Sequence, residues 1–91
     1  MDHAAILRTD ERRALVLMTE GRWLGAHDGD GRRRAWVQLS RRDGDDIPVG
    51  WDVFARLRAA GYLAAGARLP RGGRRFHLTA AGRAILTAPG A

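Results

Sequence analysis

The sequence FARLRAAGYLAAGARLPRGGRRFHLTAAGRAIL, residues 54–86, decides the fold class because its periodicity changes from helix to strand and back. Its first residues belong to a helix that the pattern predicts from residue 49 or 50 to residue 60, ended by Gly61. Short strands are predicted at 67–69 and 74–78, joined by a tight Pro-Arg-Gly-Gly turn. Thr79 then caps a short terminal helix. The expected core residues of this half are Val53, Phe54, Leu57, Ala60, Tyr62, Leu63, Phe76, Leu78, Ala81, Ile85 and Leu86.

The preceding half predicts one helix and one hairpin. Thr9 is the expected N-cap of a helix over 9–20, with acids in its first turn and Gly21 at its end. Its apolar stripe consists of Ala14, Leu15, Leu17 and Met18. Residues 22–27 and 33–40 predict the two strands of a hairpin around the turn Asp-Gly-Asp-Gly. Residues 41–50 predict a polar connection without regular structure.

Trp36 has two interpretations. Alternation along the return strand places Ala35, Val37 and Leu39 on one face and Trp36 with Gln38 on the other, polar face. An exposed tryptophan is a candidate recognition residue. The favoured interpretation is that it packs across the hairpin against a neighbour such as Trp23.

Positive charge is concentrated in one half of the chain. Residues 53–91 contain seven arginines and no acid, whereas residues 1–52 contain nine arginines and ten acids. All sixteen basic residues are arginine, so a composition bias is the alternative explanation. Bias does not explain the missing acids, and the asymmetry therefore favours a face that binds a polyanion.

Composition limits the remaining classes. Ninety-one residues predict a single domain over 1–91, with a frayed tail at 88–91. The chain has no cysteine, which excludes disulfides and thiolate chemistry, and a cytoplasmic location is the expectation. No signal peptide and no apolar run long enough for a bilayer are present, so no membrane partner is expected.

No enzyme, cofactor or metal site is expected. The three histidines form no i,i+4 pair, and the Asp-Gly-Asp-Gly run after His27 lacks the later ligands of a calcium loop. The acids of residues 43–46 lie on a short connection, and the single serine, Ser40, has no evident base.

Residues 54–86 resemble the second half of a winged helix-turn-helix domain of the MarR and PadR types. The similarity is carried by the helix 54–60, the Gly61-Tyr62-Leu63 turn, the arginine-rich loop 71–75 and the closing run 76–83. It implies a small α+β winged-helix domain with three short helices, an extra N-terminal β-hairpin and a C-terminal two-stranded wing. Its sheet is expected to be three-stranded or to consist of two hairpins.

The resemblance has one departure. A helix-turn-helix needs a full helix immediately before the recognition helix, and residues 40–50, with Gly44, Pro48 and Gly50, cannot form one. The chain also resembles the YjhX-type family of small toxins that inhibit a DNA topoisomerase, and that family has a hairpin in place of the missing helix. That resemblance rests on landmarks spread over Glu11-x-Arg13-x-Leu15, Gly21, Gly31, Ser40-Arg41-x-x-Gly44 and Val53-Phe54-x-x-Leu57.

The sequence therefore predicts a DNA-binding module, acting in transcriptional control and dominated by phosphate contacts through helix 50–60 and wing 67–78. The candidate DNA contacts are Arg56, Arg58, Arg68, Arg71, Arg74, Arg75 and His77. The alternative is a toxin-like module that docks on a protein of DNA metabolism, such as a topoisomerase. A homodimer is a further possibility, and it needs helix 9–20 or the terminal helix as its interface.

Overall fold

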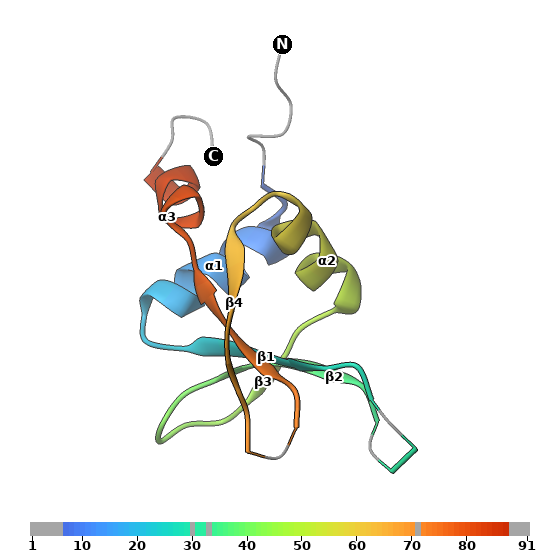
Figure 1. Cartoon of the computed structure of the whole chain (residues 1–91). Helices are drawn as coiled ribbons and strands as arrows, with labels where there is room; N and C mark the ends of the chain where they lie inside the picture. Colours follow the sequence, from blue (N-terminus) through green and yellow to red (C-terminus); the bar gives the residue numbers. More distant parts are fainter. Residues whose placement is uncertain (1–6, 30, 33, 71, 88–91) are drawn as a thin grey trace.

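The computed structural model describes residues 7–29, 31–32, 34–70 and 72–87 (Figure 1). The elements in chain order are α1 (Thr9–Thr19), β1 (Trp23–His27), β2 (Trp36–Ser40), β3 (Ile47–Pro48), α2 (Trp51–Ala59), β4 (Leu63–Arg68), β5 (Arg74–Leu78) and α3 (Ala80–Thr87). The α+β class and three short helices are thus confirmed for the described residues.

The two expected hairpins join into one antiparallel sheet. Its strand order is β3-β2-β1-β5-β4, and the pairs Leu24–Phe76 and Ala26–Arg74 join β1 to β5. The sheet therefore has five strands, where the sequence had predicted three strands or two hairpins. The fifth strand is β3, which pairs with β2 and corrects the expectation that 41–50 is irregular. A proline is tolerated in β3 because β3 is an edge strand with one unpaired side.

The core lies between one face of this sheet and the helices. Figure 1 shows α1, α2 and α3 gathered on the same side of β1 and β2. Leu15, Leu24, Leu39 and Leu57 are the largest fully buried side chains. Three alanines that the sequence predicted at apolar positions are exposed instead. Ala35 lies before the start of β2 and Ala60 lies after the end of α2, whereas Ala81 lies on the outer side of α3.

Two caps position the helices. The N-cap of α1 is Arg8 instead of Thr9, and its backbone N–H donates to Oε1 of Glu11 at 2.8 Å. Thr79 caps α3 as predicted: its hydroxyl oxygen accepts from the Gly82 N–H at 3.1 Å. The same hydroxyl donates to the Gly61 carbonyl at 2.7 Å, so one side chain joins the end of α2 to the start of α3.

Gly82 explains the spacing of the closing run. A Cβ at this position would lie 2.7 Å from both Leu78 Cδ1 and the Tyr62 carbonyl oxygen. Only glycine therefore allows α3 to approach the turn after α2 this closely.

Within the described ranges, no helix is long and apolar enough to cross a bilayer.

Candidate nucleic-acid interface

Arg56 is held by the acids of two helices. Its Nε donates to Oε2 of Glu11 at 3.0 Å, and its other nitrogens lie 3.2 Å from Asp52 and 3.7 Å from Asp10. The hydrogen bond to Glu11 is the main reason why the pKa of Arg56 is raised above its ordinary value, while partial burial opposes the shift. The charge of Arg56 is therefore balanced inside the fold, and this residue ties α2 to α1.

Arg58, two residues further along α2, has a different environment. Its guanidinium lies 5.1 Å from the ring centroid of Phe76 and 5.6 Å from that of Phe54. These are cation–π distances, which orient the side chain without neutralising its charge. No carboxylate among the described residues forms an ion pair with this exposed arginine.

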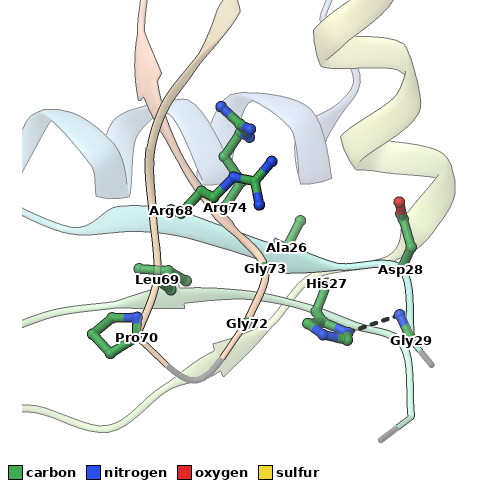
Figure 2. Close-up of a pocket in the computed structure, with 10 residues that line it drawn as sticks. All are labelled: Ala26, His27, Asp28, Gly29, Arg68, Leu69, Pro70, Gly72, Gly73 and Arg74. Atoms are coloured by element: carbon green, nitrogen blue, oxygen red, sulfur yellow. Dashed lines mark hydrogen bonds between the residues drawn. The ribbon is translucent and has the colours of Figure 1, made fainter. Parts of the chain in front are cut away.

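Arg68 and Arg74 are paired across the hairpin β4–β5. They are register partners, so their side chains leave the sheet on the same face. Figure 2 shows the two side chains next to each other, on the side of β1 from which Ala26 projects. Arg74 donates to the Gly66 carbonyl at 3.2 Å, and no described carboxylate forms an ion pair with either residue.

These residues form one charged surface, which we call the arginine cluster: Arg58, Arg68 and Arg74. Phe76 connects its two parts, since Arg58 covers the Phe76 ring and Arg74 lies two residues earlier on the same face of β5. Two positions along a strand span only about 7 Å. The cluster therefore occupies the junction between α2 and the hairpin β4–β5, on the helix-covered side of the sheet.

A pocket of about 520 Å³ adjoins this cluster (Figure 2). It lies where the hairpins diverge beyond the Ala26–Arg74 pair, and its lining comprises Ala26, His27, Asp28, Gly29, Arg68, Leu69, Pro70, Gly72, Gly73 and Arg74. Its described charged groups are two arginines and one aspartate. Arg71, another predicted contact, lies outside the described residues.

The pocket depends on two glycines with positive φ. Gly72 and Gly73 have φ of 94° and 88°, which a side chain rarely tolerates. A Cβ on Gly73 would lie 2.5 Å from the Ala26 carbonyl oxygen, and one on Gly72 would lie 2.8 Å from Nε2 of His27. The turn can therefore lie directly against the end of β1.

Arg75 and His77 project from the opposite face of the sheet. Strand alternation separates them from Arg74, and both are exposed. The Arg75 guanidinium lies 5.0 Å from the Trp23 ring, while the Trp36 ring stacks on His27 with centroids 6.0 Å apart and planes at 17°. The predicted packing of Trp36 across its hairpin is confirmed, with His27 as its ring partner.

The structure thus distributes the six described candidate contacts over three environments: an ion-paired position, the arginine cluster and the open face of the sheet. Sequence reasoning missed Trp51, which is 42% exposed at the start of α2. The sequence signal for an exposed Trp51 was its position just before the predicted apolar stripe of the helix. The pocket had no local signal, because it forms between hairpins distant in sequence.

Searches against family models, curated proteins and solved structures found no match to this chain.

Proposed function

We propose that this protein is a duplex-DNA-binding module of winged-helix type, which contacts phosphates through the arginine cluster. The observation that carries the proposal is the position of the cluster. Three arginines without a described carboxylate partner lie where the helix α2 meets the hairpin β4–β5. In a winged-helix protein, this junction lies between the recognition helix and the wing.

The like charges of Arg68 and Arg74 support an anionic ligand. Like charges directly opposite each other on neighbouring strands destabilise a sheet. Arg74 is partly stabilised by the Gly66 carbonyl, but no described carboxylate compensates the pair. A phosphate group bound between the two guanidinium groups would remove this repulsion and form charge-assisted hydrogen bonds.

The order α2–β4–β5–α3 is the order of recognition helix, wing and closing helix in the proposed fold type. In this proposal, the hairpin β1–β2 and the short β3, which precede α2 in the chain, replace the helix that normally precedes the recognition helix. We therefore expect binding dominated by phosphate contacts with weak sequence preference, since the outward residues of α2 include few base-reading side chains. A role in transcriptional control is part of the proposal.

The test is a titration of a fluorescently labelled random-sequence duplex at several salt concentrations. Each of Arg58→Gln, Arg68→Gln and Arg74→Gln should weaken binding and lower the slope of log affinity against log salt by about 0.9. The matched control is Arg83→Gln, an exposed arginine on α3 outside the cluster. Absence of binding at low salt, or equal effects in Arg83→Gln, contradicts the proposal.

The alternative of a protein-docking module is favoured by one observation, the exposed indole of Trp51. It is the only large hydrophobic side chain exposed among the described residues, and tryptophan is enriched in interface hot spots. If duplex binding fails, the experiment that follows is affinity capture with wild-type protein and Trp51→Ala. A partner retained by the wild type and lost by the variant would establish docking through α2.

A further inference from the structure

The face of the sheet opposite the helices carries a group of aromatic rings. Alternation along β1 and β2 places Trp23, His27 and Trp36 on this open face, with Gly25 between the first two. We call Trp23, His27 and Trp36 the aromatic face. Figure 1 shows the helices on the other side of β1 and β2.

The two indoles converge over Gly25. A Cβ at this position would lie 3.0 Å from Cζ3 of Trp36, 3.1 Å from Cζ3 of Trp23 and 3.3 Å from Cδ1 of Leu69. The missing side chain therefore lets both rings lie on the sheet backbone. Beside them is an apolar pocket of about 270 Å³, lined by Trp23, Trp36, Gln38, Leu69, Pro70 and Gly72.

The size and lining of this pocket indicate a planar ring as its ligand. Pockets for drug-sized molecules usually range from about 300 to 1,000 Å³, so this one suits a smaller group. Its walls are two indoles and two aliphatic side chains. Gln38 Nε2 donates one N–H to Ser40 Oγ at 3.3 Å, and the other groups of this amide can hydrogen-bond the edge of a ring.

The charge beside the pocket indicates that the ligand also carries a negative group. Arg75 is exposed and lies over the Trp23 ring, which fixes its direction and leaves N–H donors available. The residues that share this face on β1, β2 and β5 include no acid: Trp23, Gly25, His27, Trp36, Gln38, Ser40, Arg75 and His77.

We propose that the aromatic face binds an unpaired base of a single-stranded nucleic acid, with the base in the pocket beside Trp36 and the adjacent phosphate on Arg75. A base within a duplex cannot present its face to an aromatic side chain, whereas single strands bind by stacking and backbone charge. The proposal goes beyond duplex binding and uses residues outside the arginine cluster. Either function can therefore fail without the other.

The test compares two labelled ten-nucleotide strands: oligothymidylate and an abasic strand of the same length and charge. At physiological salt, wild-type protein should bind thymidylate roughly tenfold more tightly than the abasic strand, because stacking of one base is lost. In a Trp51→Phe background, where Trp23 and Trp36 are the remaining tryptophans, thymidylate should quench the fluorescence and the abasic strand should not.

Variants locate the site. Trp36→Ala should reduce thymidylate affinity to the level of the abasic strand, whereas Trp51→Ala, the matched loss of an indole elsewhere, should not. Arg75→Gln, an exposed substitution that leaves the indoles in place, should weaken both strands. Equal wild-type affinity for the two strands overturns the proposal. The proposal is also overturned if Trp36→Ala folds and still binds thymidylate more tightly than the abasic strand. If Trp36→Ala unfolds, the same comparison is made with Trp36→Leu, which keeps the apolar volume but has no ring.

Discussion

Replacing Arg68 by glutamine should weaken DNA binding and yet leave the free protein as stable as before or more so. Arg68 faces Arg74 across the hairpin, is exposed, and has no described carboxylate partner. Cross-strand pairs of this kind are worth about 0.2–1 kcal/mol, so removing the repulsion should raise the free energy of unfolding by up to that amount. For a chain of this size, 1 kcal/mol corresponds to a rise in Tm of about 4–8 °C.

The loss of DNA affinity follows from counterion release. If Arg58, Arg68 and Arg74 each neutralise one phosphate, the salt slope is about −2.7, and raising salt fourfold weakens wild-type binding by about 40-fold. With two arginines left, the slope is about −1.8 and the same change weakens binding by about 12-fold.

Two measurements decide this prediction. Fluorescence anisotropy at four salt concentrations gives the slope, and thermal unfolding without DNA gives the stability; Arg83→Gln serves as the control in both. A slope equal to that of the wild type would show that Arg68 contacts no phosphate. A clear fall in Tm would show that its side chain stabilises the fold, and the argument from charge repulsion would then be wrong.

Three further outcomes are expected. Glu11→Gln should lower the denaturant midpoint in urea unfolding, because it removes the carboxylate that holds Arg56, while the salt slope of DNA binding stays unchanged. The N–H of Val53, followed by the Arg56 guanidinium, lowers the pKa of Asp52 below its ordinary value of 3.8. The ionised Asp52 carboxylate therefore stabilises the fold above about pH 4, and this stabilisation is lost as pH falls through the lower folded-state pKa. The difference in unfolding free energy between wild type and Asp52→Asn, measured by urea unfolding, should therefore be smaller at pH 2–3 than at pH 7. Gly82→Ala should cost about 1–3 kcal/mol in urea unfolding through overpacking, although alanine normally stabilises a helix interior; an unchanged midpoint would refute the close-approach explanation.

Most local elements could be predicted because their signals lie within short windows of sequence. The strand expected at 67–69 was placed wrongly, since β4 runs from Leu63 to Arg68 and its small residues 64–67 show no apolar alternation. Val53, Phe54 and Leu57 repeat at helical spacing and are buried, and Phe76 and Leu78 alternate and are buried as expected. Thr79 was recognisable as a cap because threonine is a preferred N-cap residue, and in the structure its hydroxyl accepts from the N–H three positions later.

The pairing of β1 with β5 could not be predicted in the same way. It joins residues about fifty positions apart, and nothing in either strand specifies its partner beyond an apolar face. The strand β3 was hidden for another reason: Pro48 argues against a strand unless the edge position is already known.

The environment of Arg56 shows that contacts between distant segments also limit what the sequence predicts about the candidate site. The only sequence signal that separates Arg56 from Arg58 is the i,i+4 spacing of Asp52 and Arg56, and it involves an exposed pair of modest strength. Only the packing of α1 against α2 brings Asp10 and Glu11 to one of them and leaves the other on phenyl rings. Charge counting predicts that a basic surface exists, but tertiary packing decides which guanidinium groups remain free to bind an anion.

The consecutive arginines of β5 show how one strand can serve two surfaces. Because side chains alternate, Arg74 joins the arginine cluster on the helix side and Arg75 joins the aromatic face on the other. A double substitution would therefore combine two effects, and single substitutions are needed. Arg74→Gln should lower the salt slope for duplex DNA and preserve the preference for thymidylate over the abasic strand. Arg75→Gln should instead weaken the binding of both single strands and leave the salt slope for duplex DNA unchanged. If both variants weaken both ligands equally, the two faces act as one diffuse positive surface, and the division argued from strand alternation has no functional consequence.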